Sequence, residues 1–204
     1  MNKDWTGNNN LYVCNHRTKD SMVAAHDLYC THPDSIKLFL NKAKERHLDI
    51  PKQIWEPAAG LNSIVNVLKE NKYDVLATDL VDRGLNQENL DFLQQTKESV
   101  KRYKPYLKCI FTNPPYAFAK EFVEKSLELL ENDGICIMFL KLTFLESKKR
   151  YSLFKNHKLK HVWIYSERQG CGKNTTMFEN SGAAAYAMFI WYNSYDGLPE
   201  IDWI

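Results

Sequence analysis

The segment 135–140 reads Ile-Cys-Ile-Met-Phe-Leu, an apolar run without polar residues at alternate positions. A strand with one face in water alternates apolar and polar residues, whereas a strand inside a parallel sheet is apolar on both faces. The run therefore predicts a strand buried on both faces. A sheet of that kind has helices on each side, so strands and helices should alternate along the chain.

The chain shows this alternation up to about residue 161. Strand-like segments near 54–56, 74–79 and 109–111 are separated by segments with helical spacing of apolar residues near 33–47, 64–71 and 117–131. Two strands, 162–165 and 183–192, then follow each other. We expect an α/β fold with a doubly wound, mostly parallel sheet, in which a C-terminal hairpin adds an antiparallel strand. The tail 197–204 is expected to dock as a strand or turn.

Length and composition are those of one soluble domain. The chain has 204 residues, of which 44% are hydrophobic and 25% are charged. We expect an irregular arm over 1–26 and a single domain over 27–204. No apolar run is long enough to span a membrane, and the N-terminus lacks the layout of a signal peptide. The five cysteines show no CxxC spacing, which favours a reducing cytoplasm.

The N-terminal region contains a scattered set of possible zinc ligands. Structural zinc sites usually pair their ligands at C-x₂₋₄-C or H-x₃₋₅-H spacing. That paired spacing is not present here, so we expect no metal. The set consists of Cys14, His16, His26, Cys30 and His32.

The tetrapeptide Asn113-Pro114-Pro115-Tyr116 follows the predicted strand 109–111. Proline has a fixed φ and no amide N–H, and it keeps the preceding residue out of the helical region. Two prolines in succession should hold the Asn113 side chain and the carbonyls of Asn113 and Pro114 as a row of acceptors. Such a row suits an amino group on a flat ring, against which Tyr116 could stack. The alternative is a simple turn after a strand.

A second candidate site begins at Glu56-Pro57-Ala58-Ala59-Gly60, between a strand and a helix. Small residues in such a turn let a ligand approach backbone N–H groups at the helix N-terminus. Glu56 could meet an ammonium group. Asp79 ends the next strand, where an acid binds ribose hydroxyls in doubly wound sheets. An ordinary solvated aspartate is the alternative for Asp79.

These motifs, in this order, resemble those of amino-methyltransferases that use S-adenosylmethionine, above all the DNA adenine-N6 methyltransferases. The tetrapeptide matches the Asn-Pro-Pro-Tyr signature of that family. Tyr29-Cys30-Thr31-His32-Pro33 resembles its Tyr-x-Thr-Pro-Pro motif, with His32 replacing a proline. The turn resembles the family's cofactor loop, with Asn62 in place of the last glycine. Asn is the residue that best replaces glycine at positive φ, so we expect weaker packing of the loop and not a lost site.

The resemblance implies a Rossmann-like class I methyltransferase fold with S-adenosylmethionine as the cofactor. It places Tyr29 and Thr31 beside the methionine end of the cofactor. Asp91 would accept from the cofactor's adenine amino group, and Phe92 would pack on that ring. The full set of expected cofactor residues is Tyr29, Thr31, Glu56, Ala58, Gly60, Asp79, Asp91, Phe92 and Asn113.

Local structure offers alternatives for two of these motifs. The segment 29–34 is also explained as a helix start, with Thr31 as the N-cap, Pro33 in the first turn and Asp34 at the positive helix end. The segment 89–93 is also explained as part of an amphipathic helix.

The resemblance also implies a mechanism of direct methyl transfer to an adenine that has been swung out of the base stack. Asn113 and the Pro114 carbonyl would accept hydrogen bonds from its amino group, while Tyr116 holds the ring. The expected catalytic residues are Asn113, Pro114, Pro115 and Tyr116. No metal is required.

Two basic runs, 97–108 and 141–161, flank the tetrapeptide in the sequence. Such clusters can neutralise phosphates, although most are solvated faces. The polar segment 166–182 adds further basic residues and an aromatic. The expected nucleic-acid contacts are Lys148, Lys149, Arg150, Arg168, Lys173 and Phe178.

We expect DNA as the partner, with RNA less favoured, no membrane, and a monomer or weak dimer. The chain has no room for a large target-recognition segment, which favours relaxed or short-site specificity, as in compact methyltransferases of phages and mobile elements. Two alternatives remain. One is a methyltransferase acting on adenine in RNA or on a glutamine amide in protein, and the other is an inactive nucleic-acid-binding module.

Overall fold

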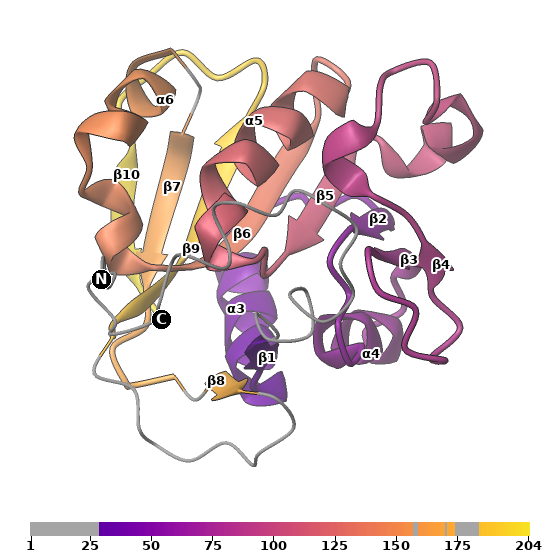
Figure 1. The fold of residues 1–204 in the computed structure, drawn as a ribbon. Helices are drawn as coiled ribbons and strands as arrows, with labels where there is room; N and C mark the ends of the chain where they lie inside the picture. The colour runs from indigo at the N-terminus through magenta and orange to yellow at the C-terminus, as the bar shows by residue number, and fades with distance from the viewer. Residues whose placement is uncertain (1–28, 157–158, 170, 174–183) are drawn as a thin grey trace, which may run out of the picture.

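The computed structural model describes residues 29–156, 159–169, 171–173 and 184–204 (Figure 1). The expected arm over 1–26 therefore lies outside the described residues. Within the described part, no helix combines the length and apolar character needed to cross a membrane.

An eight-stranded sheet forms the centre of the molecule, with strand order β10-β7-β9-β6-β5-β2-β3-β4. All neighbouring pairs are parallel except those of β9, which is antiparallel to both β6 and β7. This confirms the predicted α/β sheet with an antiparallel C-terminal strand. The strands are β2 (Gln53–Glu56), β3 (Asp74–Asp79), β4 (Glu88–Asn89), β5 (Cys109–Thr112), β6 (Ile135–Lys141), β7 (Leu159–Ile164), β9 (Tyr186–Tyr192) and β10 (Glu200–Trp203).

A separate two-stranded sheet pairs β1 (Tyr29–Thr31) with β8 (Cys171–Lys173) in antiparallel orientation. Figure 1 shows this small sheet beneath the start of α3. The tail forms β10, which lies parallel to β7 at the edge of the large sheet. The expectation of a docked terminal strand is therefore confirmed.

Helices cover both faces of the large sheet. Residues of α3 (Pro33–Glu45) and α4 (Ser63–Glu70) belong to one hydrophobic cluster, and residues of α5 (Ala119–Leu129) and α6 (Tyr151–Asn156) belong to the other. Short 3₁₀ helices complete the connections. They are η1 (Phe92–Gln94), η2 (Lys101–Tyr106), η3 (Tyr116–Phe118), η4 (Leu142–Leu145) and η5 (Lys148–Arg150).

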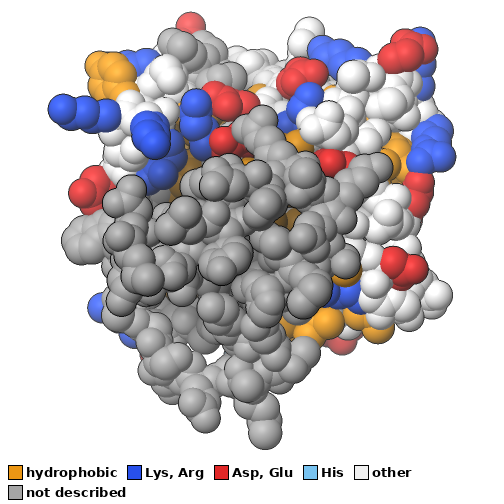
Figure 2. All heavy atoms as spheres, viewed as in Figure 1, with side chains coloured by type: hydrophobic (Ala, Val, Ile, Leu, Met, Phe, Trp, Pro, Cys, Tyr) orange, Lys and Arg blue, Asp and Glu red, His pale blue; other side chains and the backbone are white. Residues whose placement is uncertain are grey.

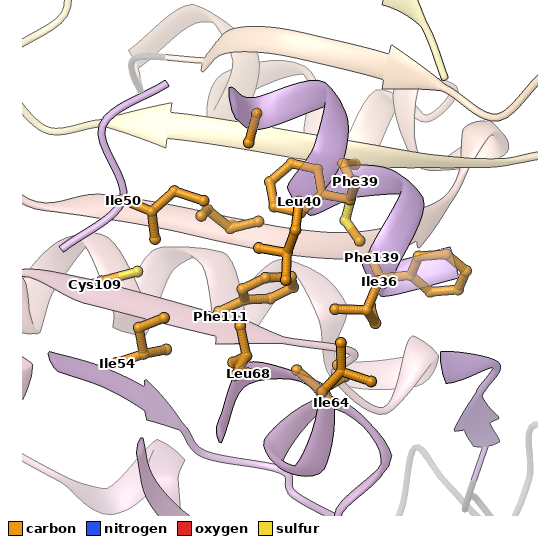
Figure 3. Packing of buried hydrophobic residues seen from close by; sticks show 14 of the residues in the cluster. Ile36, Phe39, Leu40, Ile50, Ile54, Ile64, Leu68, Cys109, Phe111 and Phe139 are labelled. Carbon is orange, nitrogen blue, oxygen red and sulfur yellow. The ribbon is translucent and has the colours of Figure 1, made fainter. Parts of the chain in front are cut away.

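The apolar run 135–140 forms most of β6, and each of its six side chains is 1% exposed or less. Ile135, Ile137 and Phe139 pack into the cluster beneath α3, whereas the alternate residues pack into the cluster beneath α5. In Figure 3, side chains of α3 lie over Phe111 of β5, with Ile64 and Leu68 of α4 alongside. The sequence prediction of a strand buried on both faces is confirmed.

Two local expectations were wrong. Thr31 is not the N-cap of α3, because its backbone pairs with Cys171 in the small sheet. His32 caps the helix instead, and its Nδ1 accepts a hydrogen bond from the Asp34 amide at 3.2 Å. The segment 89–93 is also not an amphipathic helix. It consists of the end of β4 followed by η1, and the Asp91 side chain accepts from the Leu93 amide at 3.2 Å.

Candidate active site

The candidate site lies along one edge of the large sheet. Strands β2, β3 and β5 run parallel, so their carboxyl ends meet at the same edge, where doubly wound folds bind ligands. Glu56 ends β2, Asp79 ends β3, and Asn113 follows the last residue of β5. The three polar residues predicted from separate motifs therefore lie at the carboxyl ends of neighbouring strands.

Asp79 is bound to the loop that follows β2. Its Oδ2 accepts from the Gly60 amide at 2.7 Å, and its Oδ1 accepts from the Val81 amide at 2.9 Å. Asp79 is buried, with 7% of its surface exposed. Asp79 therefore holds the two loops at the strand ends together, a structural function that the sequence did not reveal.

The loop between β2 and α4 depends on two residues with positive φ. Gly60 has φ 53° and Asn62 has φ 62°. Asn62 thus takes the left-handed conformation expected of a residue that replaces glycine. Gln87 fixes the loop from the other side, because its Nε2 donates to the Gly60 carbonyl at 2.7 Å and to Asn62 Oδ1 at 2.8 Å.

Glu56 is the most deeply buried acid of this edge, at 0% exposure. Its Oε1 accepts from the Ala58 amide at 3.0 Å, whereas its buried Oε2 has no hydrogen-bond partner among the described residues. Burial raises the pKa of Glu56 to about 8, and the Thr112 hydroxyl and the Ala58 amide oppose that shift. Thr112 Oγ1 lies near Glu56 without reaching hydrogen-bond geometry with any described group.

The Asn-Pro-Pro-Tyr segment is fixed at both ends. Asn113 Nδ2 donates to Thr31 Oγ1 at 2.9 Å, which links two motifs that are 82 residues apart. Tyr116 begins η3, and its ring lies 4.7 Å from the Lys141 Nζ. Its hydroxyl lies 3.3 Å from that of Tyr186. The turn is therefore anchored to β1 on one side and to the ends of β6 and β9 on the other.

Two predicted cofactor residues have other partners in the structure. Phe92 is 2% exposed, and its ring packs against Trp55 at 5.2 Å and Phe122 at 5.0 Å. This burial leaves little of the ring for a ligand, so we revise its role from cofactor contact to core packing. Asp91 caps η1 through Leu93. For Tyr29, only the backbone pairing with Lys173 in the small sheet is described.

The predicted nucleic-acid residues do not share one environment. Lys148 and Lys149 are exposed in η5, and Figure 2 shows basic side chains gathered at the upper left, where Figure 1 places α6. Arg150 differs from the prediction. Its guanidinium donates to the carbonyls of Phe144, Thr143 and Glu146, so we assign it a structural role. Arg168 is exposed before β8, and Phe178 lies outside the described residues.

The sequence interpretation missed two residues that contact this site and one exposed aromatic residue beside η5. Lys141 and Tyr186 are partners across the β6–β9 ladder and both contact Tyr116. The end of the apolar run 135–140 could have identified Lys141, because that residue is the first polar one after it. Tyr151, 64% exposed, borders a hollow that Leu145, Ser147 and Lys148 also line.

No metal site is indicated by the part of the chain that the structure describes, which contains no suitable group of three or more His, Cys, Asp or Glu residues. Cys30 is a buried free thiol, and His32 caps α3. The other three zinc candidates, Cys14, His16 and His26, lie outside the described residues.

Comparison with known proteins gives a fold and no family. No family model matches the chain, and no curated protein matches it either. Among solved structures, a protein from Listeria monocytogenes described as a class I S-adenosylmethionine-dependent methyltransferase has a TM-score of 0.55 and 15% identity, over 85% of this chain and 64% of that one. An RNA methyltransferase from Pyrococcus horikoshii has a TM-score of 0.53 and 12% identity, over 83% and 88%.

The complex of DrdV with DNA gives a TM-score of 0.56 at 13% identity, over 90% of this chain. The chain spans only 28% of DrdV and 64% of the Listeria protein. At such low identities these similarities establish the fold alone. The chain has the class I, Rossmann-like methyltransferase fold, as the sequence predicted.

Proposed function

We propose that this protein binds S-adenosylmethionine and transfers its methyl group to the N6 amino group of adenine in DNA. The observation that carries the proposal is the placement of Asn113. It follows a parallel strand at the ligand-binding edge of a methyltransferase fold, and the neighbouring strand β2 ends in the buried Glu56. An amide acceptor beside a cofactor loop is what transfer to an amino nitrogen requires.

The residues of the first loop fit the cofactor. Glu56 Oε2, buried and without a hydrogen-bond partner among the described groups, would accept from the cofactor's ammonium group. Asp79 would take ribose hydroxyls with its remaining acceptor capacity, since a carboxylate has about four lone-pair sites. The small residues Ala58 and Gly60 would let the ligand approach the backbone. When bound, S-adenosylmethionine supplies an electrophilic methyl group on a sulfonium centre.

The tetrapeptide would act on the methyl acceptor. Asn113 Oδ1 and the Pro114 carbonyl would accept hydrogen bonds from the two N–H groups of the adenine amino group. These bonds would favour a pyramidal nitrogen, whose lone pair is no longer delocalised into the ring. The same acceptors would stabilise the positive charge that develops on nitrogen as its bond to the methyl carbon forms and the sulfur–methyl bond breaks, much as an oxyanion hole stabilises negative charge. The neutral thioether would be the leaving group, and the methylated nitrogen would then lose one proton. Positioning would supply much of the remaining rate.

DNA is favoured over other amino-group substrates by two features. The segment 29–33 resembles the corresponding DNA-methyltransferase motif, and exposed basic residues follow β6, whose carboxyl end lies beside that of β5. Tyr151 adds an exposed aromatic ring among these charges, a combination suited to nucleic acid.

The substrate class is tested by supplying methyl-labelled S-adenosylmethionine with duplex DNA, single-stranded DNA, RNA or protein under identical conditions. We expect label in DNA. Label only in RNA, or only in protein, would replace the DNA assignment with that alternative. Absence of heat on titration with S-adenosylmethionine would instead indicate an inactive module.

Cofactor binding is expected to release about 0.9 proton at pH 7, because a carboxyl with a pKa of about 8 is mostly protonated there and must ionise to pair with an ammonium. Affinity should therefore rise as the pH approaches 8 and should fall again at higher pH, where the cofactor's own amino group loses its proton. Calorimetry in buffers of different ionisation enthalpy measures the release. Glu56→Gln should abolish it, and an equal release in that variant would exclude Glu56 as the source.

The exposed lysines of η5 are expected to contribute to DNA affinity and not to cofactor affinity. Replacing Lys148 and Lys149 with alanine should reduce the log–log salt slope of DNA binding by about two units, about one for each phosphate that is no longer neutralised. The matched control is Lys44→Ala with Lys69→Ala. Both are exposed lysines near the C-terminal ends of α3 and α4, away from the strand ends that form the site. Equal slopes in the two double variants would show that η5 is only a solvated face.

A further inference from the structure

We propose that Thr31 is a positioning residue that holds the Asn113 carboxamide in its reactive orientation. The inference rests on the proposed function for its catalytic consequence and on the hydrogen bond of 2.9 Å from Asn113 Nδ2 to Thr31 Oγ1 for its structural content. The sequence interpretation had assigned Thr31 to the cofactor, and the structure instead shows it bonded to the candidate catalytic residue.

Orientation matters because a carboxamide has two unlike ends. Oδ1 accepts hydrogen bonds and Nδ2 donates them, and a half-turn of the side-chain amide exchanges the two. A substrate amino group needs an acceptor. A threonine hydroxyl can accept or donate, so the contact with Thr31 holds the amide in place without selecting its end by itself. In the structure Nδ2 is the end bound to Thr31, which places Oδ1 at the other end and keeps the donor away from the substrate.

Thr31 is itself held firmly. It is 2% exposed and lies in β1, where it pairs with Cys171 of β8. One residue later His32 caps α3, and the Ser35 amide donates to the His32 carbonyl at 3.0 Å. The hydroxyl that contacts Asn113 is thus placed between a strand and a helix start, and not on a free loop.

A second contact fixes β5 to the same helix. Phe39 of α3 packs edge-on against Phe111 of β5, with ring centroids 5.4 Å apart (Figure 3). Successive strand residues point to opposite faces, so Asn113 follows Phe111 toward the face that α3 covers. The helix therefore holds β5 through Phe39 and is preceded by the residue that holds Asn113. Thr31 at the end of β1 and Phe39 on α3, which begins two residues later, thus contact β5 and the residue that follows it, which explains how the amide can be aligned before any ligand binds.

The inference is tested with Thr31→Val, which removes the hydroxyl and keeps the shape, and with Thr31→Ser, which keeps the hydroxyl. Thr78→Val is the matched control, because Thr78 Oγ1 accepts from Trp55 Nε1 at 2.9 Å in the core, the same kind of contact at another place. Three quantities are measured for each: turnover on DNA, the dissociation constant of S-adenosylmethionine, and the side-chain amide NMR signals of Asn113 in cofactor-free protein. Their loss in Asn113→Ala assigns those signals.

We expect Thr31→Val to lower turnover about tenfold through loss of alignment, with cofactor affinity unchanged and the Asn113 amide signals shifted. Thr31→Ser should retain at least about half of the turnover, because the hydroxyl is kept. Thr78→Val should lower the melting temperature while leaving the amide signals in place. If Thr31→Val does not fold, Thr31→Ala against Thr31→Ser gives the same comparison.

Three results would overturn the inference. Unmoved Asn113 signals in Thr31→Val would show that the hydrogen bond does not hold the amide. Weaker cofactor binding with normal turnover at saturation would return Thr31 to the cofactor site. Equal losses in the valine and serine variants would point to packing. The NMR comparison needs no substrate, so it decides the structural point even if methyl transfer is not found.

Discussion

Asn113→Ala is expected to lower the turnover of methyl transfer by at least about 10²–10³-fold, the cost of removing one preorganised group that stabilises developing charge. The acceptor matters most in the transition state, when positive charge appears on the amino nitrogen. Turnover at saturating substrate is therefore the quantity that should fall. Cofactor affinity should barely change, because Glu56 and Asp79 lie on other strands.

Asn66→Ala is a suitable control for this variant. Asn66 is an exposed asparagine on α4, and its replacement tests the loss of a carboxamide outside the site. Single-turnover rates and calorimetry on the three proteins separate chemistry from binding. Wild-type turnover in Asn113→Ala, with the cofactor still bound, would refute the assigned mechanism. Pro114 and Pro115 would then have only the structural role of forming a turn.

Asp79→Ala is expected to weaken S-adenosylmethionine binding by about 1–3 kcal/mol, or roughly 5- to 150-fold in the dissociation constant, as for a charged hydrogen-bond acceptor. Two losses combine. The ribose loses its expected partner, and the Gly60 and Val81 amides lose the carboxylate that holds the loops together. Calorimetry measures the first loss, and thermal unfolding without ligand measures the second.

Asp82→Ala provides a close match for that experiment. Asp82 is an exposed aspartate three residues further on, and its Oδ1 accepts from the Gly84 amide at 2.9 Å. Asp82 therefore has the same carboxylate and caps a backbone amide in the same loop after β3, whereas the Gly60 amide is bound by Asp79. If both variants bind the cofactor as tightly as the wild type does, Asp79 is not a ligand residue.

The mostly parallel sheet with its antiparallel C-terminal strand, and the strand ends where a ligand would lie, could be predicted because they depend on local patterns. The uninterrupted run 135–140 indicated a doubly buried strand, and the acids at the ends of two strands indicated where a ligand would lie. Asn62 illustrates the same point at one residue. Its chemistry permits positive φ, and the structure shows φ 62° there.

The contacts that organise the site could not be predicted, because they join residues far apart in the chain. Nothing near Thr31 signals that its hydroxyl meets Asn113, 82 residues later. The same holds for Arg150, which looked like part of a basic surface until its three carbonyl partners were visible. The revised role of Phe92 has a different cause. The local sequence around an aromatic residue does not show whether its ring packs on a ligand or in the core, and the structure places the Phe92 ring in the core.

The central claim is that Asn113 directs methyl transfer to an adenine amino nitrogen in DNA. The direct test incubates the protein with methyl-labelled S-adenosylmethionine and adenine-containing duplex DNA, digests the DNA and identifies the labelled nucleoside by mass spectrometry. We predict N6-methyldeoxyadenosine with the wild-type chain and none above background with Asn113→Ala. Label on a carbon or oxygen atom, or equal N6 label with both proteins, would contradict the claim.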